Sequence, residues 1–164
     1  YSTGRFWKGL PEPKMKFDHN PQSQDVSQGD SQHLPLPKES VSSIMFDPPF
    51  LVNSKQSGII CSRFSSYPSV KELWKFYEES LKEFWRILIP QGILAFKCQD
   101  QVSSGKQFWS IKTILNHADQ IGFSLLDLFI LYRKNVIWGK NSINQQHARK
   151  NHCYFLVLQK PDEK

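Results

Sequence analysis

Short apolar runs alternate with longer amphipathic stretches in this chain, starting near residue 40. Runs typical of buried strands cover residues 41–46, 93–96, 123–132 and 153–158. Apolar residues spaced by three and four predict helices over residues 70–88 and 108–121, between the first three runs. The chain therefore reads as strand, helix, strand, helix, strand, followed by a long hairpin and a last strand.

The two predicted helices carry their own start and stop signals. Ser69 with Glu72 three residues later predicts a capped start for the first helix, and the turn at residues 90–92 predicts its end. Gly122 is the stop signal of the second helix. The residues predicted to face the core are Val70, Leu73, Trp74, Tyr77, Leu81, Phe84, Trp85 and Leu88 in the first helix, and Ile111, Ile114, Leu115 and Ala118 in the second.

The element order predicts an α/β fold in one domain spanning residues 1–164. Helical crossovers imply a mostly parallel, Rossmann-like sheet, and the final hairpin implies an antiparallel last strand. Residues 1–13 read as a loop, residues 14–17 as a very short strand ending at Asp18, and residues 20–40 as a polar connector. Ligands of such sheets bind beyond the carboxyl ends of the strands, where Asp47 is predicted to lie.

Charge narrows the class of partner. The net charge is +6 and the isoelectric point is near 9.2, which favours an anionic partner. No Asp or Glu occurs from residue 128 to residue 160. The cations of this segment are Arg133, Lys134, Lys140, Arg149, Lys150 and Lys160, interleaved with Tyr132, Trp138 and Tyr154. Either the segment is a solvated loop beside a core strand, or it faces a phosphate backbone.

Cysteine usage and hydropathy favour a cytoplasmic or nuclear protein with no membrane association. Cys61, Cys98 and Cys153 are odd in number and widely spaced, which fits reduced thiols rather than a disulfide framework. No apolar run approaches the roughly 20 residues that span a bilayer, and no secretion leader opens the sequence. His147, His152 and Cys153 cluster, but they are too few for a metal site, so no metal is expected.

The segment FDPPF at residues 46–50 carries the candidate chemistry. Each proline fixes its backbone and lacks an N–H, so the chain after the strand is extended and stiff, with carbonyls that lack local partners. The Asp47 carboxylate and these carbonyls form an array of acceptors that suits an amino group with two hydrogens, such as adenine N6 or cytosine N4. Phe50 can stack on the planar ring of such a base.

FDPPF after an apolar strand resembles the (D/N)-P-P-(F/Y/W) motif of S-adenosylmethionine-dependent methyltransferases that modify amino groups of nucleobases. LKEFWRILIPQGILAFK, which ends at Lys97, and the terminal HCYFLVLQK are similar to later elements of that family. The resemblance implies a class I methyltransferase fold with S-adenosylmethionine as cofactor. It also implies that Asp47 and the Pro48 carbonyl accept hydrogen bonds from the target amine, and that Phe50 stacks on the base. The predicted catalytic residues are Asp47, Pro48, Pro49 and Phe50.

The cofactor side of the resemblance is less complete. The family places a glycine-rich loop after its first strand, whereas Gly4 and Gly9 follow no strand here, so the loop either precedes Tyr1 or the N-terminal half is abridged. The predicted cofactor-binding residues are Gly4, Asp18, Asp30 and Asp47; Asp18 and Asp30 fit solvated loop acids equally well. The predicted substrate contacts are Phe50, Lys97, Lys134, Lys140, Arg149 and Lys150.

The sequence leaves several functions open. The leading hypothesis is a methyltransferase acting on adenine N6 in nucleic acid, with RNA slightly ahead of DNA because no helix resembles a reader of the major groove. Cytosine N4 and a protein amine are further targets. The alternative is a catalytically degenerate subunit of the same fold that binds nucleic acid or scaffolds a partner subunit. A Rossmann-like domain for another nucleotide is a third hypothesis, without a phosphate-binding fingerprint to support it.

Overall fold

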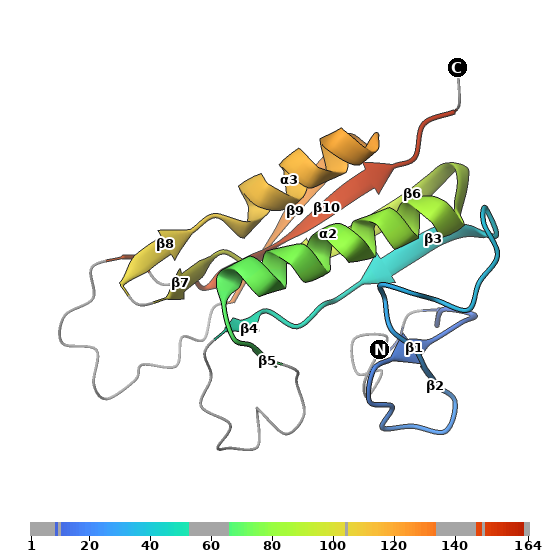
Figure 1. The fold of residues 1–164 in the computed structure, drawn as a ribbon, viewed down its shortest axis with the longest axis horizontal. Helices are drawn as coiled ribbons and strands as arrows, with labels where there is room; N and C mark the ends of the chain where they lie inside the picture. Colours follow the sequence, from blue (N-terminus) through green and yellow to red (C-terminus); the bar gives the residue numbers. More distant parts are fainter. Residues whose placement is uncertain are drawn as a thin grey trace.

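The structure is a computed structural model that describes residues 9, 11–52, 66–103, 105–133, 147–148 and 150–162. Its strands are β1 (Phe17–Asp18), β2 (Ser27–Gln28), β3 (Val41–Phe46), β4 (Leu51–Val52), β5 (Ser66–Tyr67), β6 (Leu88–Cys98), β7 (Gln101–Ser103), β8 (Lys106–Phe108), β9 (Ser124–Tyr132) and β10 (His152–Gln159). Its helices are α2 (Val70–Ile87) and α3 (Ser110–Ile121). The α/β class predicted from the element order is confirmed (Figure 1).

The central sheet has four strands in the order β3-β6-β10-β9. Strand β3 runs parallel to β6, and β10 runs antiparallel to both β6 and β9. The last strand is therefore antiparallel, as predicted. It lies between β6 and β9, a position that the order of elements along the chain did not reveal.

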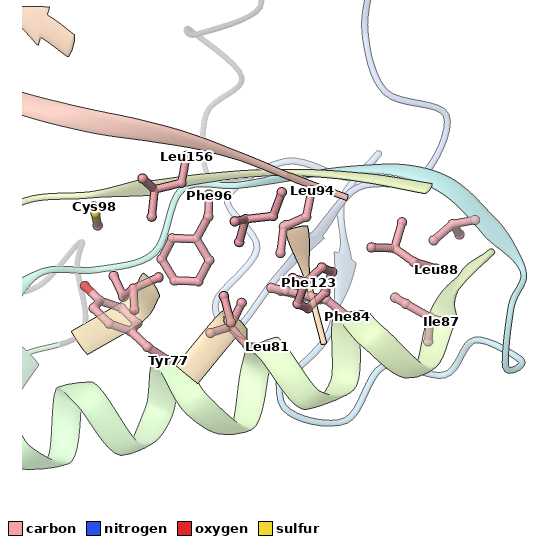
Figure 2. Packing of buried hydrophobic residues seen from close by; sticks show 14 of the residues in the cluster. Tyr77, Leu81, Phe84, Ile87, Leu88, Leu94, Phe96, Cys98, Phe123 and Leu156 are labelled. Carbon is pink, nitrogen blue, oxygen red and sulfur yellow. The ribbon is translucent and has the colours of Figure 1, made fainter. Parts of the chain in front are cut away.

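Helices α2 and α3 pack against each other and enclose the main core with the sheet (Figure 1). Strand β6 alternates, so that Leu94, Phe96 and Cys98 point to the helices and are fully buried. Figure 2 shows side chains of α2, including Tyr77 and Phe84, filling the space beneath this strand. The amphipathic pattern of the first predicted helix thus identified one wall of the core.

The helix boundaries follow the predicted signals to within two residues. The Ser69 side chain accepts a hydrogen bond from the Glu72 backbone N–H at 3.2 Å, which confirms the cap of α2. Gly122 ends α3 with φ at +115°, a backbone conformation that favours glycine. Helix α3 begins at Ser110, two residues after the predicted start.

The predicted end of the first helix is confirmed to within one residue, whereas the next strand begins earlier than predicted. Helix α2 stops at Ile87, and β6 begins at once at Leu88, five residues before the predicted strand. Tertiary hydrogen bonds explain the difference: the Gln91 N–H donates to the Lys160 carbonyl at 2.8 Å, and the Lys160 N–H donates to the Gly92 carbonyl at 3.0 Å. The proline-glycine turn therefore lies within the strand, where it joins the end of β10. A hairpin of β7 and β8 also lies between β6 and α3.

Strand β9 forms one edge of the sheet and is unusually exposed for so apolar a segment. Its large apolar side chains are between 47% and 61% exposed at Leu125, Leu126, Phe129, Ile130, Leu131 and Tyr132. In the described ranges, neither helix has the length and hydrophobicity that crossing a membrane requires.

Candidate active site

The predicted site forms where β3 and β6 end side by side. Because these parallel strands pair Phe46 with Phe96, the next residue of each, Asp47 and Lys97, reaches the same edge of the sheet. The Lys97 ammonium lies 2.8 Å from Oδ1 of Asp47. The aspartate side chain is 46% exposed while the lysine side chain is 16% exposed, so the carboxylate faces outward from a partly buried cation.

A buried tyrosine of α2 forms a hydrogen bond with the proline segment. Tyr77 of α2 is 0% exposed, and its hydroxyl donates a hydrogen bond to the Pro49 carbonyl at 3.1 Å. Burial raises the pKa of Tyr77 well above its ordinary value, so this hydroxyl keeps its proton and stays a donor. The partner of the Pro49 carbonyl is not local: it is a hydroxyl from another element, 28 residues away.

Phe50 completes the cluster predicted from the sequence. Its ring is half-buried, and its centroid is 5.9 Å from the Lys97 ammonium. Pro48 is buried beside it. The structure thus brings Asp47, Phe50 and Lys97 together at one end of the sheet, on a backbone that two prolines and one hydrogen bond fix.

Of the predicted cofactor residues, Asp30 acts electrostatically on Tyr67. Burial first, and then the charge of Asp30, raise the pKa of Tyr67. The Tyr67 ring packs on Phe76, and Phe76 packs on Phe46 at the end of β3. The Asp30 carboxylate also accepts the Gln32 backbone N–H at 2.9 Å.

The remaining predicted cofactor residues are not drawn into the cluster by any described contact. Asp18 lies in β1, which pairs with β2, and its side chain accepts the Asn20 backbone N–H at 2.9 Å. Gly4 lies outside the described residues. Both assignments stay predictions.

The predicted substrate-contacting cations of the acid-free segment differ in whether the structure describes them. Lys134, Lys140 and Arg149 lie outside the described residues, so their predicted role stays a prediction. Lys150 lies near the carboxyl end of β6, because its carbonyl accepts a hydrogen bond from the Gln99 side chain at 3.0 Å.

The acid-free segment suggested that Lys160 is a surface cation, but the structure places it in the interior. It is 1% exposed, and its ammonium donates to Glu39 at 3.0 Å and to the carbonyls of Trp85 and Leu88 at 3.2 and 3.0 Å. These carbonyls belong to the last turn and the C-cap of α2, where a cation also interacts favourably with the helix dipole. Lys160 therefore closes a helix end inside the molecule.

Sequence reasoning missed a polar network beside the cluster. Asp100 is 2% exposed; its Oδ2 accepts the Tyr154 hydroxyl at 3.3 Å, and its Oδ1 accepts the Ile111 backbone N–H at 3.2 Å. The His152 ring contacts the same tyrosine hydroxyl at 3.0 Å. No sequence signal marks Asp100, because its partners lie 11 and 54 positions away.

Histidine and cysteine side chains do not converge on a metal in the described part of the chain. His147 contacts the Gly105 carbonyl at 2.8 Å, whereas His152 contacts Tyr154. Cys153 is half-buried in β10. The two histidines that lie close in the sequence thus have separate described contacts.

Comparison with family models decides the family. Residues 41–164, three quarters of the chain, match the model of the N6/N4 methyltransferases, described as DNA methylase. The chain belongs to this DNA methylase family. The resemblance noted from the FDPPF motif is confirmed, and S-adenosylmethionine is confirmed as the cofactor at the level of the family.

Solved structures of methyltransferases share the fold. One is named as a DNA modification methylase of Thermus thermophilus in complex with S-adenosylmethionine; it has a TM-score of 0.56 and 19% identity, over 83% of this chain and 55% of that one. The cytosine-N4-specific PvuII DNA methyltransferase has a TM-score of 0.55 and 19% identity, over 80% and 47%. A protein named as a methyltransferase of Bacillus halodurans has a TM-score of 0.55 and 12% identity, over 97% and 86%.

These likenesses confirm the class I methyltransferase fold and set its extent. The chain spans about half the length of the two DNA methylase structures that it matches. No curated protein sequence matched the chain closely enough to count as a relative.

Proposed function

We propose that this protein transfers a methyl group from S-adenosylmethionine to the exocyclic amino group of a base in DNA. The observation that carries the proposal is the pair of Asp47 and Lys97 at the end of β3, followed by a proline backbone that Tyr77 fixes. DNA replaces RNA as the preferred substrate because the matching family is one of DNA methylases. Adenine N6 is the first target to test, with cytosine N4 as the second.

The carboxylate geometry suits an amino group with two hydrogens. Lys97 lies against Oδ1 of Asp47, and the carboxylate is 46% exposed, so we assign its second oxygen to a donor on the substrate. The Pro48 carbonyl supplies a second acceptor, since the Pro49 carbonyl is engaged by Tyr77. Holding both N–H bonds orients the amine nitrogen toward its reaction partner, and such positioning supplies a large part of the rate enhancement of enzymes.

Phe50 supports the target base, and Lys97 holds the Asp47 carboxylate. The half-exposed ring of Phe50 offers a flat surface on which the target base stacks. The Lys97 ammonium pairs with Asp47 and fixes the orientation of its carboxylate. In this arrangement Lys97 is a positioning residue, whereas Asp47 and Phe50 contact the substrate.

The described residues fit part of a cofactor site. When bound, S-adenosylmethionine supplies a methyl group made electrophilic by the sulfonium. Asp47 borders the place where that group must meet the amine, and the half-buried Asp30 carboxylate, beyond Tyr67 and Phe76, offers acceptors for hydroxyl or amino donors of the cofactor. Gly4 and Asp18 are further candidates for this side of the site.

The decisive test replaces Asp47 by alanine. Methyl transfer from labelled S-adenosylmethionine to DNA should fall by about 100-fold or more, because the charge and position of the carboxylate are lost. Circular dichroism should show an unchanged fold, because the side chain is 46% exposed at a strand end. Full activity of the purified variant contradicts the assignment. Adenine-only and cytosine-only substrates identify the target base.

Phe50→Ala tests the stacking role separately. The variant should bind substrate DNA more weakly by roughly 1 to 3 kcal/mol, the usual effect of removing one base stack. Its affinity for S-adenosylmethionine should be unchanged. If DNA affinity also stays unchanged, Phe50 contributes packing alone.

The second candidate function is the catalytically degenerate subunit of the same fold. Calorimetry with S-adenosylmethionine separates the two. Micromolar binding supports the enzyme, and no binding at millimolar ligand supports the scaffold.

A further inference from the structure

A tryptophan and a lysine meet on the surface at the start of α3. Trp109 directly precedes α3 and is 53% exposed, and the Lys150 ammonium lies 5.3 Å from the centroid of its indole ring. The two residues are 41 positions apart, so the pair depends on the fold. An exposed indole with a cation beside it combines a stacking surface with a charge that attracts phosphate.

Side-chain hydrogen bonds tie this pair to the end of β6. The Gln99 amide donates to the Lys150 carbonyl at 3.0 Å and to the His152 carbonyl at 2.8 Å. Gln99 follows Lys97 by two residues, and Lys97 contacts Asp47. A continuous path of described contacts therefore runs from the catalytic carboxylate to Lys150 and Trp109.

Helix capping does not explain the tryptophan. Trp109 occupies the N-cap position of α3 but makes no side-chain capping bond there. Asp100 supplies an acceptor from outside the helix, to the Ile111 N–H. A small polar residue at position 109 would serve the helix better than an indole, and the exposed ring contributes little to the core.

We propose that Trp109 and Lys150 form a second nucleotide subsite, on the same DNA strand as the target base. A base neighbouring the target stacks on the open surface of the Trp109 ring, and the Lys150 ammonium contacts the adjoining phosphate. The inference rests on the proposed function, because it assumes a DNA strand at Asp47 and Phe50. It adds a base-stacking contact at Trp109 and a salt-dependent phosphate contact at Lys150.

The test measures binding of a fluorescent single-stranded DNA of about 12 nucleotides, within the usual range of such sites. Trp109→Ala should weaken binding about tenfold, whereas Trp109→Phe, which keeps an aromatic ring, should stay within about threefold of the wild type. Phe129→Ala is the matched control, since Phe129 is an aromatic residue of β9 with 56% exposure. This control should bind as the wild type does.

A salt series tests the lysine. Lys150→Gln should lower the slope of log affinity against log salt by about one, as expected for one lost phosphate contact. Lys38→Gln removes the same charge from a side chain that is 66% exposed before the start of β3, and it should leave the slope unchanged. Thermal unfolding of each variant verifies that its fold is intact.

The outcomes separate the subsite from the proposed function. Weaker binding by Trp109→Ala, rescued by Trp109→Phe, together with the smaller salt slope of Lys150→Gln, supports the subsite. The subsite is overturned if Trp109→Ala binds with wild-type affinity and Lys150→Gln keeps the wild-type salt slope. That result would not affect methylation that depends on Asp47. Absence of DNA binding by the wild type overturns the proposed function, and the subsite with it.

Discussion

Tyr77→Phe removes one oxygen atom and tests whether the proline segment is held in place for catalysis. The tyrosine hydroxyl donates to the Pro49 carbonyl at 3.1 Å, and the ring packs edge-on against Phe96 with centroids 5.4 Å apart. Phenylalanine preserves the ring contact and leaves the carbonyl without this donor. The substitution therefore isolates a single hydrogen bond between the core and the motif.

The expected magnitudes follow from that bond. Loss of one intramolecular hydrogen bond costs about 1 kcal/mol, and a carbonyl left without a partner raises the cost toward about 2 kcal/mol. Activity should suffer more than stability. A shift of the reacting groups by about 1 Å can reduce turnover by roughly 100-fold, so a smaller shift of residues 47–50 should lower kcat about tenfold. Tyr77 would then be a positioning residue.

The assay compares kcat, KM and the urea midpoint of Tyr77→Phe with those of Tyr67→Phe. Tyr67 is half-buried and packs on Phe76, but its hydroxyl has no hydrogen-bonding partner in the described ranges, so its loss should leave kcat unchanged. Because burial raises the pKa of Tyr77, the ratio of wild-type to variant kcat should be constant between about pH 6 and pH 9. A Tyr77→Phe enzyme within about twofold of wild-type kcat refutes the positioning role.

Two further predictions concern stability. Lys160→Met should lower the free energy of unfolding by about 3 kcal/mol in urea titration, because Glu39 and two helix carbonyls lose their buried donor; a change below about 1 kcal/mol would show that water replaces it. Glu83 is 7% exposed, and its hydrogen bonds with Arg86 lower its pKa below the ordinary 4.5. A carboxyl with a lowered pKa stabilises the fold at pH values above its ordinary pKa, and this contribution is lost as the pH falls. Glu83→Gln should therefore flatten the decline of stability below about pH 4.5. Parallel curves of unfolding free energy against pH for the two proteins would contradict this.

Local signals in the sequence predicted the parts of the fold that depend on neighbouring residues. The cap at Ser69, the stop at Gly122 and the position of Asp47 at the end of a strand were all readable, because each depends on a few adjacent positions. Side chains that act across long intervals were not. Lys160 looked like a surface cation, although its ammonium closes a helix end 72 residues earlier in the chain.

The same limit applies to the candidate site. The motif itself indicated Asp47 and Phe50, but the donor that holds it, Tyr77, was read as one of many core residues of a helix. Trp109 gave no signal, since its partner Lys150 is brought to it by the side chain of Gln99. Such contacts depend on the order of strands in the sheet, and no sequence pattern predicted that β10 lies between β6 and β9.

The position of β10 has a consequence for how the protein is made. In the described part of the chain, β9 pairs with the sheet through β10 alone, and β10 is the later of the two to leave the ribosome. Until then β9 is a free strand rich in large apolar residues, the kind of segment that aggregates while a chain is incomplete. Among the described strands, synthesis that halts before His152 would leave only β3 and β6 paired in the central sheet, with no place for β9, so β10 decides whether β9 is folded or exposed.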